Sequence, residues 1–304
     1  MKTMSHNGVQ RLRERLGQVH DLHAAINVLQ WDMEVNMPPK AAPGRGHQLA
    51  TLSALAHRLF IEPAVSAMLD AADSGDGLTD DDRHLIRETR YDYDHQRRLP
   101  EEFVREFTEA QSSAYEVWVE ARNTSDYNLF RPHLQTLVEL LRRKADYLGY
   151  EGSPYNALLN EYERGVTVDQ LDTLFADLAK QQSALVARIV SSGRQPDTAW
   201  LDREWDVDSQ WAFTLRVLDE IGYDFAAGRQ DRSVHPFTTT FDLFDVRVTT
   251  RLDSRDLFSA LTSSLHEGGH ALYEQGFRIE DQRSPLAHAP SLGIHESQSR
   301  MWEN

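Results

Sequence analysis

Apolar residues recur every three or four positions along most of this chain, which is the period of an amphipathic α-helix. The pattern predicts helices over residues 9–28, 48–60, 79–98, 100–122, 130–148 and 208–221. Thr167 and Gln170 have the spacing of a capping box, in which each side chain satisfies a free backbone amide at the start of a helix. The sequence therefore predicts a mainly α protein.

The periodicity changes near residue 237. Residues 237–251 are rich in Thr, Val and Phe and alternate apolar with polar positions, as a half-buried β-strand does. The helical period then returns, with leucines at Leu257, Leu261, Leu265 and Leu272. We expect Ser254 to cap this helix and Asp256 to lie in its first turn. No linker divides the chain, so the prediction is one domain over residues 1–304, a large helical fold in which a small β element precedes this helix.

Gly268 and Gly269 stand in the middle of the helix that follows the β element. Each destabilises a helix interior by about 1 kcal/mol relative to Ala. Two glycines in one turn indicate that something approaches this backbone closely, whether a strand, a packed helix or a substrate.

Composition narrows the possible functions. The chain has 304 residues, a formal net charge of −16 and no cysteine. The negative charge argues against binding of nucleic acid, which requires a basic surface. Without cysteine, any metal ion must be held by His and carboxylate. No apolar run is long enough for a membrane span and residues 1–15 lack the apolar core of a signal peptide, which indicates the cytosol.

The most informative feature is His266-Glu267-Gly268-Gly269-His270, an H-E-x-x-H pattern on the predicted helix. Residues i and i+4 lie on one face of a helix, so the two imidazoles can bind one Zn²⁺ at about 2.0–2.1 Å each. Glu267 would lie beside the metal and could act as general base towards water. The alternative is an ordinary amphipathic helix with two solvated histidines.

A catalytic zinc site needs a third protein ligand. The acidic and His candidates after His270 are Glu274, Glu280, Asp281, His288, His295 and Glu296. Glu274 lies one turn beyond His270, which makes coordination of the same ion awkward. Glu296 is the better candidate, because Ser291 marks the start of a second helix that could pack against the first. The alternative for Glu296 is an ordinary solvated carboxylate. Arg300, four residues later, could form an ion pair with Glu296 on the helix surface, or could contact the metal ligands without binding the metal itself.

Several segments together resemble one known family. His266 to His270 and residues 293–298 (Gly-Ile-His-Glu-Ser-Gln) resemble the carboxypeptidase Taq family, cytosolic metallocarboxypeptidases with an almost wholly helical fold. Further segments that resemble family signatures are His235-Pro236-Phe237, the D-x-R-x-T motif Asp245-Val246-Arg247-Val248-Thr249, Trp31-Asp32 with Met37-Pro38, and residues 155–165. The resemblance covers about residues 5–304, and the motifs are jointly very specific.

The resemblance implies that His266, His270 and Glu296 bind the metal and that Glu267 is the general base and acid. Two imidazoles and one carboxylate suit Zn²⁺, and Co²⁺ or Mn²⁺ can occupy similar ligands. The residues expected to bind substrate or to support the ligands are His235, Asp245, Arg247, Thr249, His295, Gln298 and Arg300.

For two of these residues the sequence alone leaves an ordinary alternative. His235 and Arg247 would line the active-site groove if the resemblance holds. A His before Pro is otherwise a turn residue, and an Arg on a strand is otherwise a partner in an ion pair.

The chain departs from the family at its C-terminal end. It stops at Asn304, eight residues after Glu296 (304 − 296), and lacks the family's C-terminal signatures, including an Arg-bearing motif thought to hold the terminal carboxylate of the substrate. We therefore expect an N-terminal fragment in which the third ligand lies near a helix end. The full-length protein would be a homodimer if it resembles its family.

The sequence thus predicts a metallocarboxypeptidase that releases single C-terminal amino acids from peptides with broad specificity. The metal would polarise the scissile carbonyl and activate water, and Glu267 would carry the proton to the leaving amine. The alternatives are an endopeptidase or oligopeptidase with the same metal core, an inactive metal-binding fragment or helical interaction module, and a metal-free helical protein.

Overall fold

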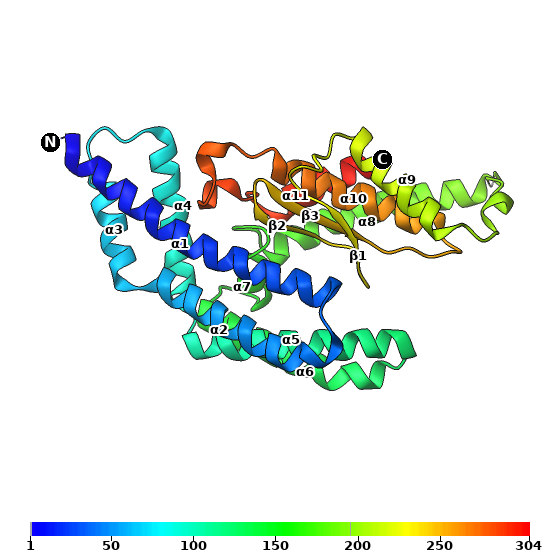
Figure 1. The fold of residues 1–304 in the computed structure, drawn as a ribbon, viewed down its shortest axis with the longest axis horizontal. Helices are drawn as coiled ribbons and strands as arrows, with labels where there is room; N and C mark the ends of the chain where they lie inside the picture. Colours follow the sequence, from blue (N-terminus) through cyan, green and yellow to red (C-terminus); the bar gives the residue numbers. More distant parts are fainter. Residues whose placement is uncertain (1, 195) are drawn as a thin grey trace.

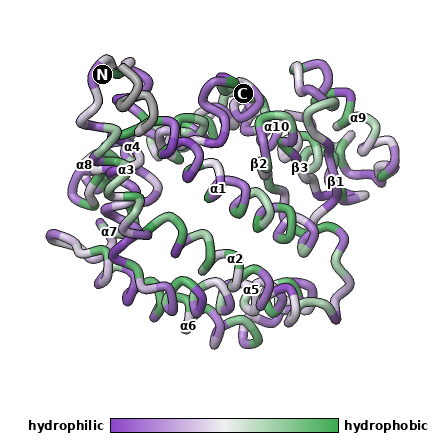
Figure 2. Tube along the Cα trace, turned by 60° about the vertical axis from the view of Figure 1, so that its left-hand side comes forward, coloured by the Kyte–Doolittle hydropathy of each residue, from purple (hydrophilic) through white to green (hydrophobic). Residues whose placement is uncertain are grey.

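The computed structural model describes residues 2–194 and 196–304. Helices make up most of this part of the chain, and a small sheet lies beside α10, the helix that carries the H-E-x-x-H pattern (Figure 1). Hydrophobic and hydrophilic positions alternate along the helices (Figure 2). Accordingly, no helix among the described residues combines the length and the apolar composition needed to cross a membrane. The predicted fold class, mainly α with a small β element, is confirmed.

The regular secondary structure of residues 2–148 consists of helices alone. Its helices are α1 (Lys2–Val35), η1 (Pro39–Ala41), α2 (Ala42–Ile61), α3 (Pro63–Asp73), α4 (Asp80–Gln96), α5 (Glu101–Thr124) and α6 (Tyr127–Leu148). α1 packs against α2 and α3, α2 packs against α5, and α5 packs against α6. The buried leucines Leu12, Leu69 and Leu85 join α1, α3 and α4 in one core. Each helix predicted in this half exists, whereas α3 was not predicted.

The second half holds shorter helices around the sheet. They are α7 (Tyr155–Leu159), α8 (Val168–Ser191), η2 (Ala199–Leu201), α9 (Val207–Glu220), α10 (Leu257–Gln275), η3 (Ile279–Asp281), η4 (Pro285–Ala287) and α11 (Leu292–Glu303). The predicted capping box of Thr167 and Gln170 is present at α8. The prediction of Ser254 as the cap of α10 is wrong. Asp256 is the cap, and its carboxylate accepts a hydrogen bond from the Ser259 amide at 2.9 Å.

The β signal at 237–251 is a hairpin rather than one strand. β2 (Thr238–Asp242) and β3 (Asp245–Thr250) are antiparallel, and β1 (Gln230–Arg232) pairs in parallel with the other edge of β3. Val246 and Val248 of β3 are fully buried and pack with Leu218 of α9 and Ala271 of α10. The sheet therefore supports α10 from one side.

The two glycines of α10 lie where neighbouring helices come closest. A Cβ atom on Gly268 would lie 2.6 Å from Leu218 Cδ2 of α9. A Cβ atom on Gly269 would lie 2.7 Å from Ser299 Cα and 2.8 Å from the Gln298 carbonyl oxygen of α11. The expected close approach is thus confirmed, and it is made by one packed helix on each side. The glycines allow α11 to lie directly against the H-E-x-x-H segment.

Candidate metal centre

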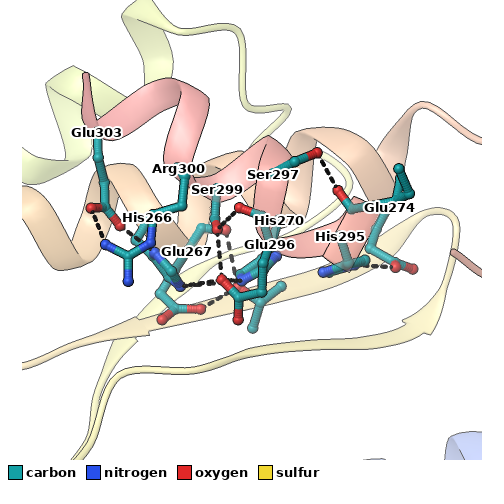
Figure 3. A network of polar contacts seen from close by, with 12 residues as sticks. His266, Glu267, His270, Glu274, His295, Glu296, Ser297, Ser299, Arg300 and Glu303 are labelled. Carbon is teal, nitrogen blue, oxygen red and sulfur yellow. Dashed lines mark hydrogen bonds and ion pairs between the residues drawn. The ribbon is translucent and has the colours of Figure 1, made fainter. Parts of the chain in front are cut away.

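Three side chains converge on one point between α10 and α11. The Nε2 atoms of His266 and His270 are 3.2 Å apart, and Glu296 Oε2 lies 3.6 Å from the first and 3.7 Å from the second. Figure 3 shows the Glu296 carboxylate pointing at both rings from the neighbouring helix. Among the described residues, these three form the His and carboxylate cluster that could hold a metal ion. The three ligands expected from the sequence are therefore brought together.

The other ring nitrogen of His266 fixes the orientation of this imidazole. His266 Nδ1 lies in hydrogen-bond contact with the Glu303 carboxylate of α11. A carboxylate accepts a hydrogen bond, so Nδ1 carries the proton and the lone pair of Nε2 faces the cluster. Glu303 is itself held by Arg300, whose Nη1 donates to Glu303 Oε2 at 2.7 Å.

His270 is neutral at physiological pH for a physical reason. Its side chain is only 9% exposed, and burial lowers its pKa to about 4, with further lowering by His295 and His266. The His295 ring stacks on it with 4.4 Å between centroids. His270 Nδ1 is buried and has no hydrogen-bond partner among the described residues. A neutral ring protonated at Nδ1 would offer the Nε2 lone pair to the cluster.

These donors fit a divalent cation. Two imidazole lone pairs and a carboxylate oxygen face one another within 3.7 Å, an arrangement that repels itself unless a positive charge lies between them. Two His and one carboxylate are also the ligand set of many catalytic zinc sites, which leave a position open. Glu296 is supported in this orientation by Ser299, whose buried hydroxyl lies 3.0 Å from Glu296 Oε2.

Glu267 lies beside the cluster and points towards the sheet. Only 6% of the residue is exposed, and the Thr238 hydroxyl of β2 lies 2.7 Å from Glu267 Oε2. Burial is the largest influence and raises the pKa of Glu267 to about 6, while the hydrogen bond from Thr238 counteracts it. The carboxylate is thus ionised at neutral pH and poised to take a proton.

His295 and Glu274 form a pair next to the cluster without joining it. His295 Nε2 lies 2.7 Å from Glu274 Oε1, and Thr240 Oγ1 donates to Glu274 Oε2 at 3.1 Å. This pair holds the His295 ring against His270. The two oxygens of Glu274 therefore bind His295 and Thr240, one each, and Glu274 is not one of the three residues that converge in the cluster.

A hollow of about 410 Å³ opens beside His266 and Glu267. His235 lines it, and the loop that carries His235 is held by Ser233, whose hydroxyl donates to the His235 carbonyl oxygen at 2.6 Å. The buried Thr249 ties this loop to the sheet, since its Oγ1 lies 2.7 Å from Ser233 Oγ and accepts from the Phe237 amide at 2.9 Å.

Three arginines also line this hollow, and their partners differ. Arg300 pairs with Glu303, and Arg122 donates to the Val234 carbonyl oxygen at 3.0 Å. Arg251 follows directly after β3 and has neither an ion pair nor a hydrogen bond to any described residue. The hollow therefore combines the catalytic candidates with one uncommitted positive charge.

Asp245 and Arg247 lie in the sheet and bind each other. Arg247 Nε and Nη2 contact the two oxygens of Asp245 at 2.7 and 2.8 Å, and the guanidinium lies 4.5 Å from the Trp31 ring centroid. Neither residue lines the hollow at Glu267. The ion-pair alternative that the sequence left open for Arg247 is thus what the structure contains.

Gln298 lies where α11 packs closest to α10. Its carbonyl oxygen faces Gly269, and its side-chain amide nitrogen lies 3.4 Å from the Ser297 hydroxyl.

Three residues of the site were missed by the sequence prediction: Thr238, Ser299 and Glu303. Glu303 had a signal, because it lies seven residues after Glu296 and therefore two turns along the same face of α11. Ser299 and Thr238 carried no comparable pattern, since short hydroxyl side chains occur throughout the chain.

Comparisons with known proteins agree with this geometry. Residues 11–304 match the family model described as Carboxypeptidase Taq (M32) metallopeptidase. Carboxypeptidase 1 of Bacillus subtilis (strain 168) is 35% identical over 290 residues, which are 95% of this chain and 58% of that protein. Thermostable carboxypeptidase 1 of Pyrococcus furiosus is 36% identical over 302 residues, 97% of this chain and 60% of that protein.

A solved structure is similar throughout the chain. The crystal structure of BsuCP superposes with a TM-score of 0.95 at 34% identity, covering 98% of this chain and 60% of its own. The chain thus spans about 60% of the length of the relatives that it matches.

Proposed function

The chain belongs to the carboxypeptidase Taq (M32) family of metallopeptidases, and from this premise we propose that it acts in the release of single C-terminal amino acids from peptides, with broad specificity. The observation that carries the proposal is the convergence of His266, His270 and Glu296 beside the buried Glu267. The curated relatives are named carboxypeptidases, which supports the same reaction. A cytosolic location and a homodimeric assembly, both implied by the resemblance, belong to the same proposal.

His266, His270 and Glu296 would hold the divalent cation, for which Zn²⁺ is the first choice and Co²⁺ or Mn²⁺ the alternatives. When bound, such a cation polarises a carbonyl oxygen and makes a nearby water molecule more acidic. Glu303 keeps the His266 lone pair directed at this position, and the stacked His295 does the same for the His270 ring.

Glu267 would move the proton. Its Oε2 accepts from Thr238, which leaves Oε1 to take a proton from the attacking water and to deliver it to the leaving amine. A pKa of about 6 suits both halves of this transfer, because the group is a base at neutral pH and a competent acid once protonated.

Arg251 favours cleavage at a chain end over internal cleavage. A carboxypeptidase must recognise the free terminal carboxylate of its substrate, and guanidinium groups bind carboxylates well. Arg251 lines the hollow at Glu267 and has no ion-pair partner among the described residues, so its charge is available for this purpose.

The test is a hydrolysis assay on the zinc-loaded chain with an N-blocked tripeptide and with the same tripeptide amidated at its C-terminus. We expect release of the last residue from the free acid only. Glu267→Gln should bind zinc normally and lose about 10²-fold or more in rate, and Arg251→Met should lose its rate mainly through KM. Cleavage of the amide at an equal rate would identify an endopeptidase. Zinc binding with no cleavage of either peptide would identify a metal-binding module.

A further inference from the structure

A second hollow, of about 500 Å³, adjoins the metal centre on the side of α1 and α5. Trp31 and Glu34 of α1 and Tyr115 and Trp118 of α5 form its walls, and we call it the Glu34 hollow. His235 lines both this hollow and the one beside Glu267. Figure 1 shows α1 running between the sheet and the layer of α2 and α5. A peptide held at Glu267 therefore has the Glu34 hollow within reach.

The Glu34 hollow continues into the helical layer. A further space of about 470 Å³ shares Glu34, Tyr115 and Trp118 with it. Beyond these residues its walls mix apolar side chains, among them Ile26, Met33, Leu49, Phe130 and Leu137, with uncharged polar ones such as Gln111 and Thr108. The combined space suits a long side chain that has an apolar stem and a polar end near Glu34.

No described Lys or Arg side chain that lines the two spaces pairs with Glu34. Among the described residues that line the two spaces, Glu34 is the one acidic residue, and none is Lys or Arg. The hydroxyl of Tyr115 forms a hydrogen bond with the Glu34 carboxylate, while burial raises the pKa of Glu34. A cation beside Glu34 would relieve the cost of keeping this carboxylate charged in a partly buried place.

The aromatic walls add a second attraction for a cation. The Tyr115 and Trp118 rings lie 5.7 Å apart, and the Arg122 guanidinium already lies 5.4 Å from the centroid of the Trp118 ring. Cations are attracted to the faces of Trp and Tyr at such distances. The hollow thus combines one carboxylate with aromatic faces, as sites for ammonium and guanidinium groups do.

We propose that the Glu34 hollow binds a positively charged group of the peptide substrate, either a Lys or Arg side chain or the N-terminal ammonium of a short peptide. The position of the hollow next to Glu267 makes it a subsite, and in that respect the proposal rests on the proposed function. Arg251 lines the hollow at Glu267 and has no ion-pair partner among the described residues, so it could take the negative terminal carboxylate while the Glu34 hollow takes the positive charge.

The experiment uses the metal-free chain and three small probes in ligand-observed NMR titrations. N-acetyl-lysine amide and N-acetyl-norleucine amide differ by one ammonium group at the end of the side chain. Norleucine amide with a free amine represents the N-terminus. We expect at least one cationic probe to bind ten-fold or more tightly than N-acetyl-norleucine amide, and the tighter of the two identifies the source of the charge.

Two variants show whether Glu34 is responsible. Glu34→Gln should abolish the preference, while Glu116→Gln, which removes the same charge one residue from Tyr115, should retain it. Circular dichroism checks that both variants are folded. Equal binding of all three probes, or a preference that survives in Glu34→Gln, overturns the proposal. Because no metal and no hydrolysis are involved, these outcomes are independent of whether the chain is a carboxypeptidase.

Discussion

His266 offers its two ring nitrogens to two carboxylates of the same helix. Nε2 faces Glu296, and Nδ1 contacts Glu303 two turns further along α11. The second contact decides which nitrogen carries the proton, and hence whether a lone pair is available at the cluster. Metal affinity should therefore depend on a residue that does not touch the metal.

Replacement of Glu303 tests this dependence. Glu303→Gln removes the charge that holds the Nδ1 proton, so we expect zinc affinity to fall by about 10- to 100-fold. Competition with a fluorescent chelator measures it. Glu220→Gln, at an exposed position at the end of α9, is the matched control and should bind zinc like the unaltered chain. Equal affinities in both variants would show that Glu303 has no part in orienting the ring.

The sequence predicted those site residues that follow the spacing of a helix. The i and i+4 spacing of His266 and His270 and a helix start at Ser291 sufficed to select Glu296. Thr238 could not be found in this way, because its contact with Glu267 joins residues 29 positions apart and depends on how β2 packs against α10. Arg247 forms an ion pair with Asp245 within the sheet, and its proposed role in the active-site groove stays a prediction.

Among the elements, α10 depends most on its neighbours. Its glycines lie against α9 on one side and α11 on the other. An added methyl group at Gly268 would meet the flexible ends of Leu218 and Ile221, whereas one at Gly269 would meet the backbone of Ser299 and Gln298. Side chains can rearrange, but a helix backbone must move as a whole.

The two glycines should therefore respond differently to Ala. Gly268→Ala is expected to cost about 1–3 kcal/mol of stability and to leave zinc affinity nearly unchanged. Gly269→Ala should displace α11, and with it Glu296, so zinc affinity should fall by ten-fold or more. Denaturant unfolding and zinc titration of both variants provide the comparison. A similar loss of zinc affinity in the two variants would contradict the assigned packing.

The predicted elements also show where periodicity fails as a guide. α8 is a helix, as its capping box indicated, yet none of its described residues is buried, and Leu174, Phe175 and Ile189 are each more than half exposed. The apolar stripe predicted the helix but not its packing. β1 was not predicted, because three residues are too few to establish an alternation.

For the molecule as a whole, the sequence established the fold class because helical periodicity and the single β signal are local. The arrangement of α1 between the sheet and α5 could not be predicted, because it depends on contacts between distant segments. That arrangement creates the Glu34 hollow next to Glu267. The sequence around either residue gives no sign that the two lie close together.

Stability should also depend on pH through Asp92, a carboxyl group that does not belong to the metal-binding cluster. Partial burial on α4 raises the pKa of Asp92 to about 6, although Arg164 at 3.4 Å counteracts the shift. A raised pKa means that the folded state holds the proton more tightly. The protonated Asp92 carboxyl therefore contributes its full share to folding stability below the unfolded-state pKa of about 3.9. That share is lost as pH rises through 6.

Asp92→Asn should accordingly gain stability relative to the unaltered chain between pH 4 and pH 7. With 40% of the Asp92 side chain exposed, the expected gain is about 1 kcal/mol at most. Urea unfolding of the metal-free proteins at both pH values measures the difference. A gain that shrinks as pH rises would contradict the assignment.

We propose above all that α10 and α11 together hold one divalent cation through His266, His270 and Glu296. The most direct measurement is the zinc content of the purified chain after zinc loading and gel filtration, determined by mass spectrometry of the metal. We predict one zinc per chain, retained in Glu267→Gln and lost in both His266→Ala and Glu296→Ala. Absence of stoichiometric zinc in the unaltered chain, or its full retention in Glu296→Ala, would contradict the account.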